Sequence, residues 1–292
     1  LVNTGIHYFT DHAFIGPNFD HCILQFETGD KTTYVDFTDR NTALGRLPSA
    51  DQGAMALVIK PGNRDISVLP IDTPEDRLIR RDIVMQLDSS GTLRQTMKTL
   101  RRGIFSSQLR SVYRFQNENE RKTDLHRVIS NEHPHVTIDT MWFDNLESVV
   151  DSIGFNYSIT ARNAANVNGS TIIYSLKLPD ILGSGYYPVE QNRKNPVDLS
   201  SSFIGIVKLE SDVELSIPES WKLIDEPKDV AIKTDNMDYS LQFKLEKGKI
   251  RVSRRLTCNY NRVFANDEFA PEQNALMQVA KSDDVKLIFN RK

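Results

Sequence analysis

The sequence predicts a mainly β (α+β) fold, in which a short N-terminal unit of antiparallel hairpins precedes a β-sandwich with an inserted helical segment. Short runs rich in β-branched and aromatic residues recur along the chain between Gly- and Pro-containing turns, as in all-β domains. Apolar residues recur at helical spacing in only two stretches. A chain of 292 residues also exceeds the usual size of one domain, so two domains are expected.

The N-terminal unit is predicted over residues 1–67. Residues 22–26 and 32–37 are strand-like and flank a turn that contains Gly29, which indicates a hairpin. A short apolar run, residues 56–59, ends before Pro61-Gly62. The polar residues that follow resemble a linker, so the sequence places the domain boundary near residue 67.

The second domain is predicted over residues 68–292 and opens with another hairpin. Its strands are residues 82–87 and 93–97, around the turn Asp88-Ser89-Ser90-Gly91. Apolar residues then recur at helical spacing, which predicts a helical insertion at about residues 106–133 with Ser106 or Ser107 as the N-cap.

Strands are predicted again after this insertion. The expected strands are residues 155–161, 170–178 and 213–217, followed by a hairpin of residues 241–245 and 250–254 around Lys247-Gly248, and a last strand over residues 285–289. A helix is expected before the last strand and is predicted to open near Pro271. Regular short strands with turn signals are typical of a β-sandwich.

Composition excludes several functional classes. The net charge is −3, which argues against nucleic acid as a partner because phosphate binding needs a basic face. No apolar run is long enough for a membrane span, and no signal-peptide pattern follows Leu1. Two cysteines give neither a disulfide framework nor a four-ligand zinc set.

The first hairpin brings a histidine and an aspartate together. A two-residue turn at Thr28-Gly29 would set His21 directly opposite Asp36, on the same face of the hairpin. Such a carboxylate can fix the tautomer of an imidazole and stabilise its protonated form, as in a nucleophile–His–Asp triad. On geometry alone, a solvated cross-strand pair is the alternative interpretation.

Residues 21–60 carry a resemblance to a known superfamily. Asp36 lies fifteen positions after His21 and is followed by Phe37-Thr38, and residues 44–48, Gln52-Gly53 and residues 56–59 come next. This stretch resembles the transglutaminase-like, papain-related cysteine protease superfamily. It is most similar to a bacterial branch whose catalytic core is followed by a C-terminal β domain of unknown function. Ile217-Pro218 before Trp221 is also similar to that later domain.

The resemblance implies roles for both residues. His21 would be the general base and Asp36 the carboxylate that orients it, for a cysteine nucleophile that attacks an amide bond of a protein or peptide. The family places that cysteine well before the histidine, so this chain is expected to be a C-terminal portion that is inactive by itself. No metal or organic cofactor is implied. The resemblance further implies an exported protein, in the periplasm or at the cell surface.

A non-catalytic function is the alternative. Some members of this superfamily have lost the triad, and the predicted sandwich would then serve as a binding or scaffolding module of an exported protein. Neither cysteine of this chain is expected to act as the nucleophile. Cys22 follows His21 on a strand and would point to the opposite face, as a small buried hydrophobe, and Cys258 is expected to be structural.

Other candidates are assigned ordinary structural roles. His126, His133 and His135 are interpreted as exposed or capping residues and not as metal ligands. The pairs Arg101-Arg102 and Arg254-Arg255 are interpreted as solvated or strand-edge charges, and Tyr186-Tyr187 as a packed loop anchor.

Overall fold

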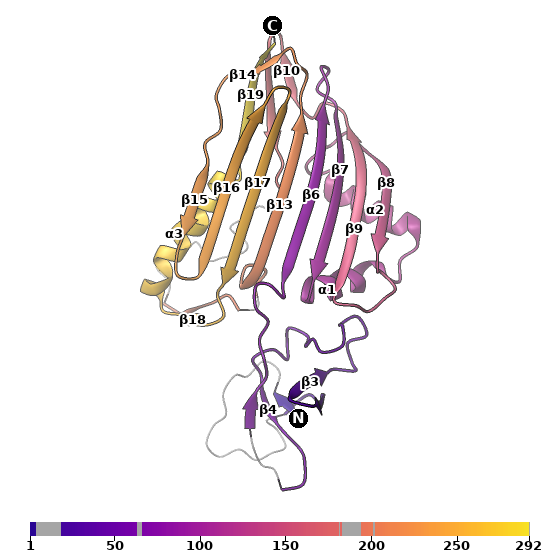
Figure 1. Cartoon of the computed structure of the whole chain (residues 1–292), viewed down its shortest axis with the longest axis vertical. Coiled ribbons are helices and arrows are strands. Elements are labelled where there is room, and N and C mark those ends of the chain that lie inside the picture. The colour runs from indigo at the N-terminus through magenta and orange to yellow at the C-terminus, as the bar shows by residue number, and fades with distance from the viewer. Residues whose placement is uncertain (4–18, 63–65, 181, 183–193, 201, 292) are drawn as a thin grey trace.

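The computed structural model describes residues 1–3, 19–62, 66–180, 182, 194–200 and 202–291. Its largest element is a mixed eight-stranded sheet (Figure 1). In order across the sheet, the strands are β15 (Val230–Lys233), β16 (Met237–Glu246), β17 (Lys249–Asn259), β13 (Ile206–Ser216), β6 (Leu78–Leu87), β7 (Leu93–Arg102), β9 (Ser152–Ala161) and β8 (Val136–Asp144). All neighbours are antiparallel except β13 and β6, which are parallel.

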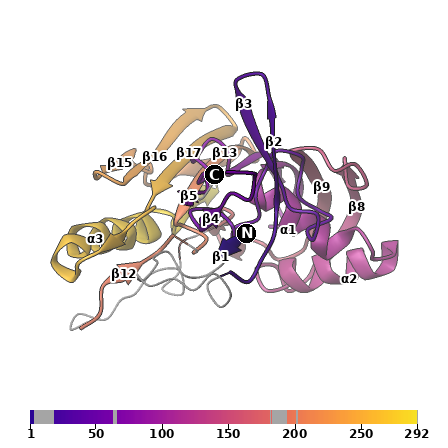
Figure 2. The ribbon, with the colours of Figure 1, turned by 90° about the horizontal axis from the view of Figure 1, so that it is seen from below.

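One face of this sheet is covered by a smaller sheet and three helices (Figures 1 and 2). The four-stranded sheet has the order β10 (Asn166–Asn168), β11 (Thr171–Leu176), β19 (Val285–Arg291) and β14 (Trp221–Leu223). The helices are α1 (Ile104–Tyr113), α2 (Glu118–Ile129) and α3 (Asn266–Ser282). A short ribbon pairs β12 (Val197–Asp198) with β18 (Val263–Phe264). The predicted mainly β fold with inserted helices is confirmed.

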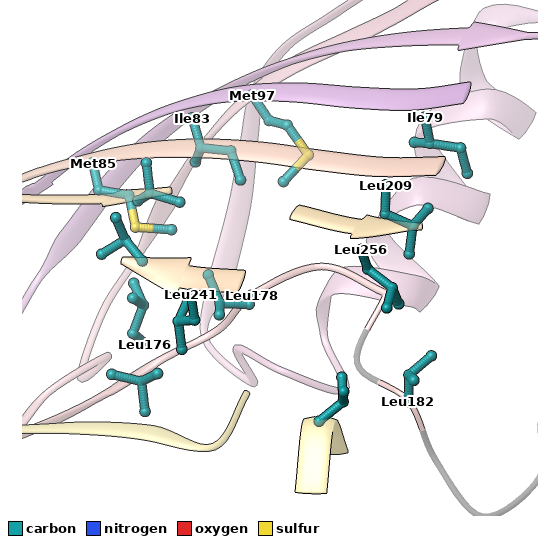
Figure 3. Close-up of a cluster of buried hydrophobic side chains, with 14 of the residues drawn as sticks. Ile79, Ile83, Met85, Met97, Leu176, Leu178, Leu182, Leu209, Leu241 and Leu256 are labelled. Atoms are coloured by element: carbon teal, nitrogen blue, oxygen red, sulfur yellow. The ribbon is translucent and has the colours of Figure 1, made fainter. Parts of the chain in front are cut away.

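The alternation of side chains along each strand determines which face is covered. Along β6, burial alternates residue by residue, so that Ile79, Ile83 and Met85 face inward while Val84 faces solvent. Figure 3 shows these inward side chains packed with leucines of β11, β13, β16 and β17. The hydroxyl of Tyr174, on β11, lies 3.7 Å from the Met85 sulfur, so the two sheets enclose one core.

A smaller unit precedes the large sheet (Figure 1). It contains a three-stranded sheet of β1 (Val2–Asn3), β4 (Met55–Leu57) and β5 (Ile66–Val68), and a hairpin of β2 (Leu24–Thr28) and β3 (Lys31–Val35). Its own core is small and contains Val2, Leu47, Ala54, Ala56 and Leu69. β5 spans the predicted boundary at residue 67, and the domain division stays a prediction.

Arg46 links this unit to the large sheet. Arg46 donates from Nε and Nη2 to the two oxygens of Asp151 at 2.9 Å each, and from Nη1 to Asp76 at 2.7 Å. Asp151 directly precedes β9 and Asp76 lies just before β6, so Arg46 ties the loop between β3 and β4 to the lower ends of two central strands. Asp151, whose hydrogen bond is the largest cause, and Asp76 raise the pKa of Arg46.

Several local predictions hold and others are wrong. The hairpins β6–β7 and β16–β17 form as expected, with β17 directly following the turn Lys247-Gly248. The N-cap of α1 is Gly103 and not Ser106 or Ser107; Gly103 has a φ of 58°, and a Cβ there would clash with the Asp76 carbonyl. Ser106 instead donates its hydroxyl to the Gly103 carbonyl at 2.7 Å.

The sequence analysis gives no separate start for α2, and the start of α3 differs from its prediction. α2 begins after Asn117, whose side chain accepts from the backbone N–H of Asn119 and Glu120. α3 begins at Asn266, so Pro271 lies within the helix and not at its start. Strand β8, which pairs with β9, was not predicted.

The structure corrects the predicted burial of several charged or polar residues. Arg254 is not a solvated charge: its side chain is 1% exposed and is paired with Asp283. Arg101 lines a cavity, and His133 is buried at 6% exposure and is not an exposed histidine. Cys258 is buried as expected. The predicted loop anchor Tyr186-Tyr187 lies outside the described residues.

A candidate active site at the first hairpin

The hairpin that carries the predicted pair forms with a different register. Thr28 pairs with Lys31, so the turn residues are Gly29 and Asp30 instead of Thr28 and Gly29. Gly29 has a φ of 60°, which a two-residue hairpin turn of this kind requires at its first position. The register is therefore displaced by two positions, and a displacement of two keeps each side chain on its face.

The structure brings His21 and Asp36 together although neither lies within a paired strand of the hairpin. His21 Nε2 lies 3.1 Å from Asp36 Oδ2. The histidine backbone is held by Val2, which donates to the His21 carbonyl at 2.8 Å and accepts from the His21 N–H at 3.2 Å. The His21 side chain is 22% exposed, and that of Asp36 is 5% exposed. The imidazole is therefore reachable from solvent, while its acidic partner is buried behind it.

Asp36 is fixed by a local turn that the sequence itself encodes. Its Oδ1 accepts from the backbone N–H of Thr38 at 2.8 Å and from the Thr38 hydroxyl at 2.8 Å. Burial by itself would raise the pKa of Asp36, but the two Thr38 hydrogen bonds and His21 together lower it. The carboxyl is therefore held as a carboxylate facing the imidazole.

A second aspartate, Asp51, completes a cluster that the sequence analysis missed. One ligand atom each from His21, Asp36 and Asp51 lies within 4.8 Å of the other two. Asp51 is 1% exposed, and its Oδ2 has no hydrogen-bond partner. The pKa of Asp51 is raised to about 6, mainly by burial; His21 acts in the opposite direction, and Asp36 and Asp20 add smaller contributions that raise it.

The position of Asp51 follows from its neighbour Gln52. The Gln52 side chain donates to the Leu47 carbonyl at 2.9 Å and to Asp72 at 2.7 Å, and its Oε1 accepts from Arg77 at 2.6 Å. These contacts fix the loop against the chain segment that leads into β6. Asp51 lies in a loop thirty positions after His21, and this spacing does not predict that the two residues meet. The sequence feature nearest to Asp51 is the adjacent Gln52-Gly53, which forms part of the resemblance described above.

The cluster has two chemical capacities. An imidazole with two carboxylates offers nitrogen and oxygen ligands of the type that Zn²⁺ accepts, and within the described ranges this is the one group of three such residues. Alternatively, a hydrogen bond from Nε2–H to Asp36 leaves Nδ1 with the lone pair, so that His21 can accept a proton from a nucleophile.

The thiols of this chain do not belong to the cluster. Cys22 is exposed, which contradicts its prediction as a small buried hydrophobe. It lines a groove of about 570 Å³ with Ile23, Ala56 and other residues of β1, β2 and β4, and none of the three cluster residues lines that groove. Cys258 lies in the core of the large sheet, where burial raises the pKa of its thiol.

Comparisons with known proteins concern mainly the part of the chain that forms the two larger sheets. A model of a family called DUF3858, a domain of unknown function with a solved structure, matches residues 171–289, from β11 to within β19. This match agrees with the prediction of a C-terminal β domain of unknown function and does not include the cluster. No curated protein matches the chain.

One solved structure is similar over part of the chain. It is the crystal structure of a putative protease from Parabacteroides distasonis, with 18% sequence identity and a TM-score of 0.33. The match covers 40% of this chain and 23% of that protein, so the chain spans less than a quarter of its length. No helix among the described residues is both long and apolar enough to cross a bilayer.

Proposed function

We propose that this chain supplies the His–Asp part of a transglutaminase-like cysteine protease or acyltransferase that acts on amide bonds of a protein or peptide. His21 is the general base, Asp36 is the carboxylate that orients it, and the thiol nucleophile comes from a residue outside the printed chain. The observation that carries the proposal is the His21 Nε2–Asp36 Oδ2 distance of 3.1 Å, in a histidine that solvent reaches.

The proposed reaction uses these two groups in a fixed order. Nδ1 of His21 takes the proton from the thiol, and the thiolate attacks the amide carbonyl carbon. The C–N bond then breaks, the amine leaves with the proton returned by His21, and an acyl thioester remains. Water gives hydrolysis of the thioester, and a second amine gives acyl transfer. Throughout, Asp36 holds the imidazole orientation and stabilises the imidazolium.

Two observations support a thiol from elsewhere. Cys22 lines a groove that none of the cluster residues lines, and Cys258 is fully buried in the other domain. We therefore expect the chain alone to lack amide hydrolysis.

The test compares two histidine variants in a full-length gene product that contains this chain. His21→Ala is expected to lower hydrolysis of a peptide amide by about a hundredfold or more, because general-base catalysis contributes on that scale. His126→Ala, at an exposed position of α2, is the matched control and is expected to leave turnover unchanged. Cys22→Ser is likewise expected to be silent.

The outcomes separate this proposal from its alternative. Equal activity in the His21 and His126 variants would remove His21 from the mechanism. An absence of any thiol-dependent activity in the full-length product would favour the non-catalytic alternative, a binding or scaffolding module of an exported protein. Localisation in the periplasm or at the cell surface is part of the proposal and is checked by cell fractionation.

A further inference from the structure

A second site is proposed in the large domain, on the covered face of the eight-stranded sheet. A cavity of about 200 Å³ lies between β6, β7 and β9, the helix α2 and the segment 177–180. Much of its lining is apolar, from Met97, Leu125, Ile129 and Phe155. None of these residues belongs to the His21 cluster, so the site is separate from the proposed active site.

The strand register places two arginines side by side in this cavity. Arg81 of β6 pairs with Thr99 of β7, so Arg101, two positions further along β7, is its diagonal neighbour on the same face. Both guanidinium groups line the cavity. Like charges at such positions repel, so the fold holds them together at an energetic cost.

Only one of the two arginines forms a direct ion pair with a described residue. Arg81 is paired with Asp180. Arg101 makes no hydrogen bond or ion pair with any described residue, and its Nε is buried without a partner. The pKa of Arg101 is lowered to about 10, mainly by burial and to a smaller extent by repulsion from Arg81, while Asp180 acts in the opposite direction. Arg101 as a whole is half-buried, and a charge that is partly removed from water without an ion-pair partner carries a desolvation cost.

The remaining titratable groups do not neutralise Arg101. Lys177 and Glu132, which also line the cavity, are exposed and of opposite sign. Burial lowers the pKa of His133, so this histidine is neutral at pH 7. Burial raises the pKa of Tyr157 to about 12, so it too is neutral. Among the described residues, one positive charge is therefore left over in a cavity lined by both apolar and polar side chains.

We propose that this cavity binds a small monocarboxylate with an apolar body, whose carboxylate pairs with Arg101. A planar carboxylate matches the guanidinium fork with two parallel hydrogen bonds, and its single negative charge balances the single uncompensated arginine. The apolar body of the ligand packs against Met97, Leu125 and Phe155. Concave, largely apolar sites with a few converging polar groups are typical of small-molecule binding.

The test uses titration calorimetry on the whole chain with three probes. Hexanoate is expected to bind, 1-hexanol to bind at least about tenfold more weakly because it lacks the charge, and inorganic phosphate to bind weakly because it lacks the apolar body. Arg101→Met is expected to weaken hexanoate binding at least about tenfold, and Arg101→Lys to weaken it less. Arg94→Met, at an exposed position on the opposite face of β7, is the matched control.

A second measurement keeps the proposal testable apart from binding strength. Without ligand, Arg101→Met is expected to raise the melting temperature relative to Arg94→Met, because it removes a half-buried charge that has no direct ion-pair partner among the described residues. Added hexanoate is expected to stabilise the unmodified chain but not the Arg101→Met variant. Equal binding of hexanoate and hexanol, equal binding in the Arg101 and Arg94 variants, or stronger binding of phosphate than of hexanoate would each overturn the proposal.

Discussion

Two buried aspartates, one in each part of the molecule, have opposite surroundings. Asp283, at the end of α3, is 0% exposed, and Asp51, in the N-terminal unit, is 1% exposed. Asp283 accepts from Arg254 Nε at 2.7 Å, from Arg254 Nη2 at 2.6 Å and from the Tyr239 hydroxyl at 2.9 Å. The Oδ2 of Asp51 has no such partner, and its neighbours are an imidazole and another carboxylate.

The difference shows where the fold satisfies a buried charge and where it does not. A bidentate arginine offsets much of the cost of burying Asp283, so this pair is a structural link between α3 and β17. No arginine offsets the burial of Asp51. Strongly perturbed carboxyls beside a histidine that solvent reaches are typical of functional sites, so this contrast adds support to the proposed active site at the first hairpin.

The largest change in the free energy of unfolding is expected when the buried pair of Arg254 and Asp283 is broken. Asp283→Asn leaves the Arg254 guanidinium buried without its counterion, and removal of one partner of a buried pair lowers the free energy of unfolding by about 3–5 kcal/mol. Urea denaturation followed by circular dichroism measures this loss. Asp212→Asn is the control, because Asp212 makes a similar bidentate pair with Arg255 at side-chain exposures of 40% and 38%.

Asp212→Asn is expected to lower the free energy of unfolding by less than about 1 kcal/mol, because ion pairs exposed to solvent contribute little to stability. Equal losses in the two variants would mean that burial does not distinguish the two pairs, and the contrast between Asp283 and Asp51 would then lose its basis.

Substitution of Asp51 is expected to raise the free energy of unfolding, by less than substitution of Asp283 lowers it. Burial raises its pKa to about 6, so between the ordinary aspartate value of about 3.9 and pH 6 the folded chain keeps a proton that the unfolded chain has lost. The stability contribution of Asp51 therefore falls as pH rises through this window. Asp51→Asn removes the penalty and is expected to stabilise the chain by about 1–3 kcal/mol at pH 7.5, with a smaller gain toward pH 4.

Asp36→Asn is the control for this experiment, because the pKa of Asp36 is shifted in the direction opposite to that of Asp51. The pKa of Asp36 is lowered, so its carboxylate adds stability above the unfolded pKa that is lost as pH falls, and the variant is expected to be less stable at pH 7.5. Urea denaturation at several pH values compares the two. A destabilising Asp51→Asn at pH 7.5, or a pH profile identical to that of the unmodified chain, would contradict the unsatisfied environment of Asp51.

The sequence predicts local features well, because short-range chemistry produces them. Gly29 and Gly91 mark their hairpin turns, and the alternation along β6 and β13 indicates which side chains are buried. The predicted contact between His21 and Asp36 is observed, although the register differs by two positions and both residues lie beyond the paired strands. Val2 holds the His21 backbone and Thr38 fixes the Asp36 carboxylate, and hairpin pairing predicts neither contact.

Features that depend on distant contacts are missed for a physical reason. Arg254 is buried because Asp283 meets it from another element, and a pair of adjacent arginines carries no sign of that partner. Asp51 joins the cluster because Gln52 is held by Asp72 and Arg77, and none of these contacts is set by a period or a motif. Cys22 is exposed because exposure alternates along residues 21–26 and Cys22 lies on the same exposed side as Leu24 and Phe26; strand alternation does not show which side of this small unit is covered.

The smallest change in stability is expected at Arg46, which links the N-terminal unit to the large sheet. The Arg46 side chain is 27% exposed and bonds with Asp151 and Asp76, so its loss through Arg46→Met is expected to cost about 1 kcal/mol. The cost is expected to be local: hydrogen exchange should accelerate in β4 and in the loop that holds Asp51, while amides of β17 keep their protection. Arg80→Met is the control, because Arg80 is half exposed and lies 3.9 Å from Asp82. Acceleration spread equally over β4 and β17 would show that the small unit and the large sheet unfold together, and Asp51 would then share the stability of the main core.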